Sequence, residues 1–184
     1  MLLPRKGEQY GLGNLVTDAQ RWAGKADIAI MNNSGMRTGL AAGIATYGSL
    51  YEIHPFGNML HKITARGSAI REFLERRVAK EVDDHVSGVR LTLDPRRPAG
   101  ARIVSLTTAD GRPFEDGATY SVVMNEYIAT GPDGVALSRA AVRSTILDLV
   151  DLDALIAYIR AQKGPIAAPN EIRIRADRAG GPSR

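Results

Sequence analysis

A short apolar run that breaks abruptly into polar residues constrains this chain more than any other feature. Ile28-Ala29-Ile30-Met31 predicts a buried strand, and Asn32-Asn33-Ser34-Gly35-Met36-Arg37 follows it directly. Asn and Gly tolerate unusual backbone angles, and such a loop leaves amide groups free to meet a ligand. The six residues therefore indicate either a plain strand-to-turn boundary or one wall of a polar binding site.

The composition is that of an ordinary globular protein. The chain has 184 residues, 44% of them hydrophobic and 24% charged, which is enough to bury a core within one domain. It contains no cysteine, which excludes disulfides and thiolate metal sites. No run of about 18 apolar residues occurs, so we expect no membrane span, and residues 1–6 lack the apolar stretch of a secretion signal.

The charge pattern favours a solvated surface over a nucleic-acid interface. The net charge is +4, the arginines are scattered, and aromatic residues make up only 5% of the chain. A nucleic-acid binder usually carries a basic stripe with interleaved aromatic residues. We therefore expect no nucleic-acid partner, although a weak attraction for phosphate-bearing small molecules is compatible with this charge.

Hydrophobic periodicity predicts a mixture of helices and strands along the whole chain. Helices are expected over 14–23, with Asn14 as N-cap, and over 47–53, 67–80 and 153–162; strands over 26–31, 59–64, 89–93, 102–107, 119–125 and 171–175. Residues 110–113 and 131–134 are predicted to be turns or loops. The expected fold class is α/β of the mixed α+β kind, a layered domain over 1–175 with a mixed sheet and hairpins, followed by a disordered tail over 176–184.

Residues suited to catalysis are few. None of the three histidines, His54, His61 and His85, pairs with another at metal-ligand spacing, and each is interpreted as structural or exposed. Ser34 does not lie in a GxSxG turn, and no glycine-rich phosphate loop with a lysine occurs. The sequence therefore predicts no catalytic residue and no metal ligand, and gives little support for autonomous catalysis.

Binding has better support, because suitable side chains lie on or beside predicted loops. Phe56 lies in a Pro-Phe-Gly turn, and Tyr127 leads into Gly131-Pro132-Asp133-Gly134. Two rings from distant loops can hold a flat heterocycle between them. Arg37 can donate several hydrogen bonds, and Asp133 can accept from paired hydroxyls. The alternatives are core packing for the two rings and plain turn formation for Asp133.

Several motifs, taken in order, resemble one known family. They are Gly13-Asn14-Leu15 with Asp18-Ala19, Asn32–Arg37, Pro55-Phe56-Gly57-Asn58, Leu74-Glu75, Ser87-Gly88-Val89-Arg90 and Gly131-Pro132-Asp133-Gly134. From about Lys6 to Ile174 the chain resembles the C-terminal domain of the bacterial and animal 5'-nucleotidase / UDP-sugar hydrolase family. The resemblance implies a layered α/β domain that holds the nucleoside part of a nucleotide.

The resemblance also implies roles for particular residues. Phe56 and Tyr127 match the two rings that hold the base, and Asn32 matches an Asn beside the base. Arg37 matches an Arg on the ribose side of the ligand, and Asp133 matches the carboxylate that binds the ribose hydroxyls.

Two further positions are matched to the family, and several residues depart from its pattern. Gly88 matches a Gly that lines the pocket, and Lys6 stands where the family typically has Arg, a better bidentate partner. The family commonly has Asn-Gly-Gly-Gly, whereas Asn33 and Ser34 are bulkier here and are expected to narrow the loop. Pro132 replaces a Gly and removes a backbone donor.

Family enzymes also carry an N-terminal metallophosphatase domain with two divalent metals, which this chain lacks. We therefore expect this chain to be the nucleotide-binding domain of a metal-dependent 5'-nucleotidase-type phosphohydrolase, with that metallophosphatase domain as its partner and without hydrolysis on its own. The alternatives are a non-catalytic binding module, or the C-terminal domain of a cyclic-nucleotide phosphodiesterase or thiosulfohydrolase. The resemblance suggests a periplasmic or extracellular location, and the sequence does not name the nucleotide.

Overall fold

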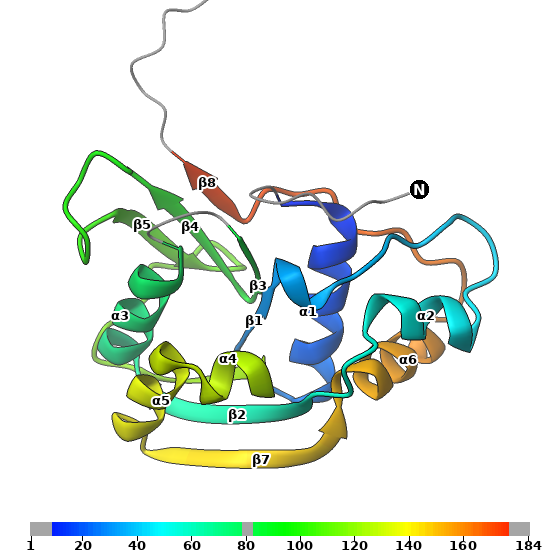
Figure 1. Cartoon of the computed structure of the whole chain (residues 1–184). Helices are drawn as coiled ribbons and strands as arrows, with labels where there is room; N and C mark the ends of the chain where they lie inside the picture. The colour runs from blue at the N-terminus through cyan, green and yellow to red at the C-terminus, as the bar shows by residue number, and fades with distance from the viewer. Residues whose placement is uncertain (1–8, 79–82, 177–184) are drawn as a thin grey trace, which may run out of the picture.

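The molecule contains two sheets, as Figure 1 shows for a computed structural model that describes residues 9–78 and 83–176. The larger sheet has the strand order β3-β1-β6-β2-β7 and the smaller one β5-β4-β8. The larger sheet comprises β1 (Ile28–Asn32), β2 (Met59–Arg66), β3 (Asp84–Ser87), β6 (Thr119–Asn125) and β7 (Arg143–Val150). The smaller sheet comprises β4 (Val89–Leu93), β5 (Ile103–Thr108) and β8 (Ile174–Ala176).

Helices cover both faces of the larger sheet. They are α1 (Gly11–Ala23), the short 3-10 helix η1 (Asn33–Gly35), α2 (Tyr47–Ile53), α3 (Gly67–Val78), α4 (Glu126–Thr130), α5 (Pro132–Arg139) and α6 (Asp151–Ala161). Figure 1 places α1, α2 and α6 on one side of β1, and α3, α4, α5 and the smaller sheet on the other. The expected layered α+β class with a mixed sheet and hairpins is therefore confirmed.

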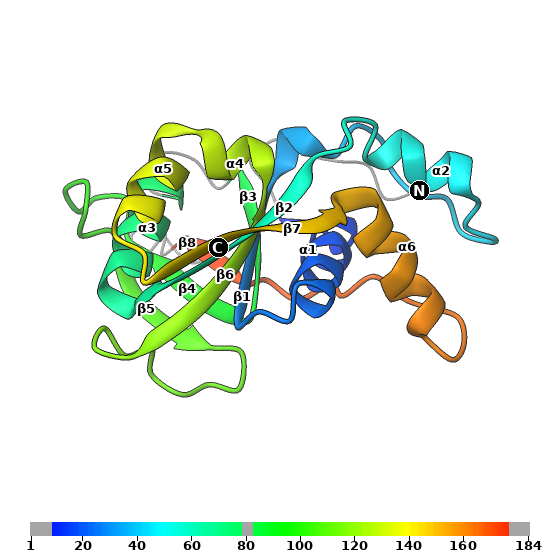
Figure 2. The ribbon, with the colours of Figure 1, turned by 90° about the horizontal axis from the view of Figure 1, so that it is seen from below.

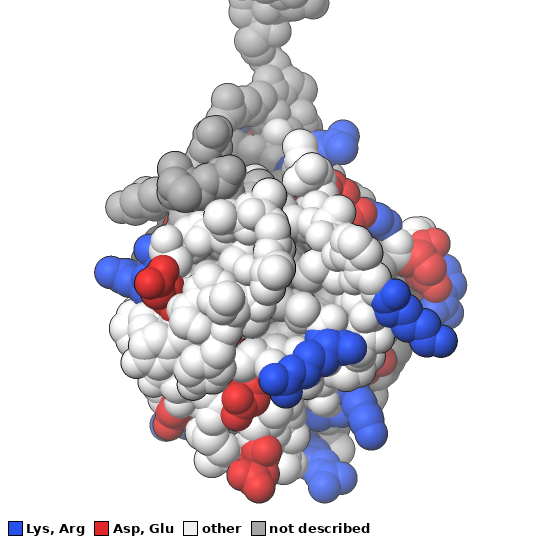
Figure 3. Space-filling view, turned by 90° about the vertical axis from the view of Figure 1, so that its right-hand side faces the viewer, with Lys and Arg blue, Asp and Glu red and all other residues white. Residues whose placement is uncertain are grey.

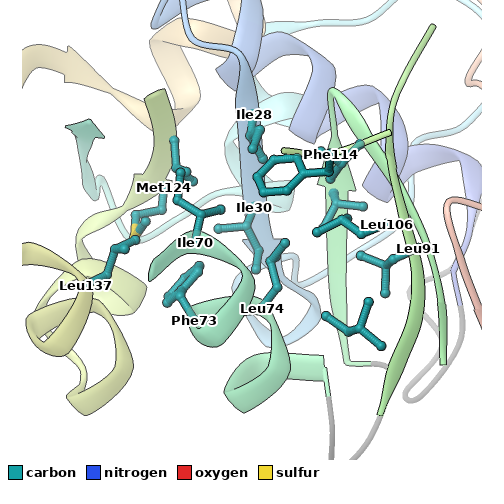
Figure 4. Close-up of a cluster of buried hydrophobic side chains, with 14 of the residues drawn as sticks. Ile28, Ile30, Ile70, Phe73, Leu74, Leu91, Leu106, Phe114, Met124 and Leu137 are labelled. Carbon is teal, nitrogen blue, oxygen red and sulfur yellow. The ribbon is translucent and has the colours of Figure 1, made fainter. Parts of the chain in front are cut away.

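The core explains why β1 is an unbroken apolar run. Ile28 and Ile30 pack with Phe73 and Leu74 of α3, as Figure 4 shows, and all four side chains are fully buried. Met31, on the opposite face of β1, packs in the cluster formed around α1, α2 and α6. A strand covered on both faces has no solvated side, so every position of β1 favours an apolar residue until the strand ends.

Strand directions gather several loops at one edge of the larger sheet, which we call the site edge. β1 and β6 are parallel, so their carboxyl ends, Asn32 and Asn125, both lie there. β3 is antiparallel to β1 and β2 is antiparallel to β6, and the starts of β3 and β2 lie at the same edge: Asp84 is paired with Asn32, and Leu60 with Asn125. The segments that follow β1 and β6 and the segments that precede β2 and β3 therefore all lie at the site edge.

Two predictions about helix ends are wrong. Asn14 is not an N-cap, because α1 begins at Gly11; its buried side chain instead donates to the carbonyls of Pro169 at 2.9 Å and Glu171 at 2.8 Å. The Gly-Pro-Asp-Gly stretch is not a loop but the start of α5, with Pro132 in its first turn. Proline is tolerated there because the first backbone N–H groups of a helix have no partner within it.

The sequence does not predict the strands β3 and β7, and the last described strand, β8, ends at Ala176. The remainder of the predicted tail, 177–184, lies outside the described residues.

The face seen in Figure 3 carries positive and negative side chains around a large uncharged area. In the described part of the chain, no helix combines the length and apolar character needed to cross a membrane.

Candidate functional site

Exposed and polar side chains gather at the site edge from segments far apart in the sequence. Figure 2 shows η1, α2, α4 and α5 along one edge of the molecule. The turn 54–58 joins α2 to β2 and therefore lies at the same edge. Of the residues predicted to bind the ligand, Phe56, Tyr127 and Asp133 lie on these segments, and Asn32 and Arg37 lie just before and just after η1.

Hydrogen bonds of Asn33 to neighbouring segments hold the loop after β1 in place. The backbone N–H of Asn33 donates to the Asp83 carbonyl at 2.8 Å, and its side-chain oxygen accepts from the Tyr10 hydroxyl. Asn33 is only 5% exposed, whereas Ser34 is exposed. The bulkier Asn33 therefore supports the loop from within, and Ser34 is the added side chain that faces outward.

Asn125 connects the two strand ends at the centre of the site edge. Its side chain is fully buried, donates to Oδ1 of Asn32 at 2.9 Å, and accepts from the backbone N–H of Ile128 at 3.0 Å. The second bond caps α4. Asn125 therefore fixes Asn32, at the end of β1, relative to the helix that carries Tyr127, and sequence reasoning assigned Asn125 no role.

Arg37 and Phe56 contact each other on one side of the site. The guanidinium carbon of Arg37 lies 5.8 Å from the centre of the Phe56 ring, close enough for a cation–π interaction. The backbone N–H of Arg37 donates to the Ile53 carbonyl at 3.0 Å, which fastens the loop to the end of α2. Phe56 is 57% exposed, so the alternative of core packing is wrong for this ring.

Tyr127 and Asp133 project from the α4–α5 segment. Tyr127 is 64% exposed, so core packing is wrong for this ring as well. The carboxylate of Asp133 lies 3.2 Å from Nε of Arg76 on α3 and remains partly accessible to solvent. This ion pair holds an acidic group in the first turn of α5, where the helix dipole also favours a negative charge.

A partly buried ion pair supports this side of the site from α3. Arg77 donates two hydrogen bonds to Asp84, at 2.9 and 2.6 Å. Burial opposes the charge of Arg77, but its bonds to Asp84, with weaker contributions from Asp133 and Tyr127, raise its pKa. The guanidinium therefore stays charged and fixes α3 against the first residue of β3.

A histidine and a carboxylate lie beneath the Phe56 turn. His54 is fully enclosed, with Nδ1 3.8 Å from Oδ2 of Asp151, and burial lowers the pKa of His54 to about 4. Burial likewise raises the pKa of Asp151 to about 6, although Asn58 donates to this carboxylate at 3.2 Å. His54 therefore has a structural role: it packs the Phe56 turn against Asp151, the first residue of α6.

The remaining two predicted residues are not brought to this group. Gly88 follows β3 at the opposite end of β1, beside Asp27, where its φ is +85° and a side chain would overlap the Asp27 carbonyl. The length of β1 separates it from Asn32 by roughly 13 Å, at about 3.3 Å per residue. Lys6 lies outside the described residues.

A cavity of ≈ 320 Å³ borders Gly88 and includes Arg21, Trp22 and Tyr158 in its lining. It is therefore distinct from the group at the site edge. Within 9–78 and 83–176, no three His, Asp or Glu side chains come together as metal ligands, so these residues do not fit a two-metal centre.

The fold and the site edge define a layered α+β domain whose exposed rings, guanidinium and carboxylate converge from separate segments. The sequence model for the family described as "5'-nucleotidase, C-terminal domain" matches residues 3–140. The chain belongs to this family.

The chain is also similar to a curated relative and to solved structures. The chain is 33% identical to the endonuclease YhcR of Bacillus subtilis over 167 residues, covering 89% of this chain but only 14% of that protein. The crystal structure of a 5'-nucleotidase precursor from Thermus thermophilus superposes with a TM-score of 0.83 at 32% identity, covering 95% of this chain and 38% of that one.

A sulfate thiohydrolase, SoxB, from Thermus thermophilus gives a TM-score of 0.73 at 20% identity, over 100% of this chain and 34% of that one, which shows the fold alone. The chain thus spans well under half the length of each of these proteins.

Proposed function

We propose that this chain holds the nucleoside part of a nucleotide, as the substrate-binding domain of a 5'-nucleotidase-type phosphohydrolase. The observation that carries the proposal is the pair of exposed rings, Phe56 and Tyr127, at one sheet edge. A flat heterocycle placed between the two rings would bury both faces by stacking, which is favourable for aromatic groups. The same rings favour a nucleotide over the small sulfur substrate of a thiosulfohydrolase.

The polar residues of the site have complementary roles in this proposal. Arg37, already stacked on Phe56, directs its remaining N–H groups toward the sugar or phosphate oxygens. Asp133, held by Arg76, accepts hydrogen bonds from the ribose hydroxyls. Asn32 lies beside the base, with its amide fixed by Asn125. Lys6 remains a candidate contact, whereas Gly88 is no longer included.

Hydrolysis is assigned to a separate domain. Two divalent metals would activate water and stabilise phosphoryl oxygens, and we propose that a metallophosphatase domain of a longer protein supplies them. This chain's own residues bind and orient the nucleoside. The purified chain is expected not to release phosphate from AMP when divalent metal is added, and measurable release would overturn this division of roles.

Calorimetric titration with adenosine, AMP and UDP-glucose tests the binding proposal. We expect Phe56→Ala and Tyr127→Ala each to weaken binding about fivefold to a hundredfold, because stacking on a ring contributes roughly 1–3 kcal/mol. Tyr47→Ala is the matched control, since Tyr47 is 65% exposed on α2 but is not one of the two proposed stacking rings.

Failure to detect heat for all three ligands at millimolar concentration would refute the nucleoside site. Equal affinity of wild type and both ring variants would instead show that the rings do not touch the ligand.

A further inference from the structure

We infer that Ser34 is a specificity-determining residue, whose hydroxyl hydrogen is directed to a lone-pair acceptor on the edge of the bound base. The acceptor is an unprotonated ring nitrogen or a carbonyl oxygen. The inference rests on the proposed nucleoside site and adds to it a contact that selects among bases.

The direction of this hydroxyl is set by a chain of hydrogen bonds that begins at a backbone group. The backbone N–H of Ile128 can only donate, so the side-chain atom of Asn125 that faces it at 3.0 Å must be the oxygen. The amide nitrogen of Asn125 therefore faces Asn32, which makes the contacted atom of Asn32, at 2.9 Å, its oxygen. The orientation of both amides is thus fixed by the network.

The chain of hydrogen bonds ends at the surface, at the Ser34 hydroxyl. With its oxygen facing Asn125, Asn32 directs its Nδ2 to the Ser34 hydroxyl oxygen at 2.8 Å. The hydroxyl therefore accepts from Asn32, and its single hydrogen must be donated elsewhere. No residue in 9–78 or 83–176 accepts that hydrogen, and Ser34 is exposed. Consecutive bonds of one direction also polarise one another, which strengthens the terminal donor.

Ser34 lies where a base stacked on Phe56 would present its edge. The Ser34 carbonyl accepts from Nη1 of Arg37 at 3.2 Å, and the same guanidinium lies over the Phe56 ring. Figure 2 shows η1, which contains Ser34, next to α4, which carries Tyr127. A base between the two rings would thus have the polarised hydroxyl at its edge. The family pattern has glycine at this position, which offers no such donor.

Deaza analogues of adenosine test this contact, because each replaces one ring nitrogen by C–H and keeps the stacking surface. Calorimetry would compare adenosine with 1-deaza-, 3-deaza- and 7-deazaadenosine. For wild type we expect one analogue to bind about five- to tenfold more weakly than adenosine, the effect of one hydrogen bond. In Ser34→Ala, adenosine should weaken by that factor and the discrimination should vanish.

Asn32→Asp is a second, nearly isosteric test. A carboxylate at this position still accepts from Asn125, but it draws the Ser34 hydrogen inward, so the outward donor is lost and the discrimination should disappear here too. Ser105→Ala, an exposed serine on β5, is the control and should keep the wild-type pattern. Circular dichroism confirms folding, and if Asn32→Asp does not fold, Ser34→Ala alone decides.

The outcomes separate this inference from the proposed function. Equal affinity of wild type for adenosine and all three analogues, or discrimination retained in Ser34→Ala, overturns the role of Ser34 while nucleoside binding stands. Absence of nucleoside binding by wild type overturns both.

Discussion

Replacing Gly88 by alanine tests the conformation of the turn between β3 and β4 and its close approach to Asp27. Gly88 has a φ of +85°, a conformation that side chains disfavour. A Cβ added there would also overlap the carbonyl oxygen of Asp27, which is backbone and cannot rotate away. The substitution therefore combines a conformational cost with a forced displacement of the segment that enters β1.

The size of each contribution can be separated with Gly111. This glycine has nearly the same φ, +88°, but a Cβ there meets nothing within 4 Å. Gly111→Ala should therefore cost only the left-handed conformation, about 1–2 kcal/mol. Gly88→Ala should cost that amount plus about 1–3 kcal/mol for the displaced backbone, by analogy with overpacking, or about 2–5 kcal/mol in total.

Urea unfolding followed by circular dichroism gives both free energies of unfolding, and nucleoside titration of the folded variants gives the dissociation constants. We expect Gly88→Ala to be the less stable of the two by at least about 1 kcal/mol, with wild-type affinity for adenosine. Equal destabilisation of the two variants would show that the close approach to Asp27 is wrong. A stable Gly88→Ala with much weaker binding would restore Gly88 to the ligand site, as the resemblance implied.

Three further predictions concern other parts of the domain. Glu75→Gln should lower stability by about 1–3 kcal/mol in urea unfolding, because the buried Glu75 carboxylate accepts from the backbone N–H groups of Arg102 at 3.1 Å and Ile103 at 2.6 Å, and an amide would turn a donor toward one of them. The imidazole of His85 should stay neutral in NMR titrations until about pH 4, because burial, and then the charge of Arg173, lowers its pKa. Its contribution to stability is present above its ordinary pKa of 6.5 and is lost as the pH falls toward 4, so a midpoint near 6.5 would contradict its burial. Asp133→Asn should remove a preference for adenosine over 2'-deoxyadenosine that we expect to be about tenfold in wild type; equal binding of both by wild type would exclude a contact of Asp133 with the ribose 2'-hydroxyl.

The elements predicted correctly from the sequence are those whose apolar pattern follows from their burial. β1 is buried on both faces and is uniformly apolar, whereas β4 alternates, with Arg90 exposed between buried Val89 and Leu91. β3 could not be found this way, because its four buried residues include the polar Asp84 and His85. Asp84 is buried against Arg77 of α3, and the burial of His85 depends on partners far away in the sequence.

His85 illustrates that dependence most clearly. The centres of the His85 and Tyr10 rings lie 4.6 Å apart in an edge-on arrangement. His85 also packs so closely on Gly13 that any side chain at position 13 would overlap the imidazole. No local pattern links residues this distant. β7 was missed for a different reason: as an edge strand it is largely exposed, and its residues run without a break into α6.

Strand direction decides which of the candidate residues can form one site, and the order of motifs along the chain does not contain it. Tyr127 follows β6, which is parallel to β1, so it returns to the edge where Asn32 lies. Phe56 precedes β2, which is antiparallel to β6, and therefore reaches the same edge from the other direction. Gly88 follows β3, which is antiparallel to β1, and is carried to the far edge. The direction of one short strand thus places Gly88 away from the site edge, although its position in the order of motifs matches the family, and the buried polar residues of that strand kept it from being predicted.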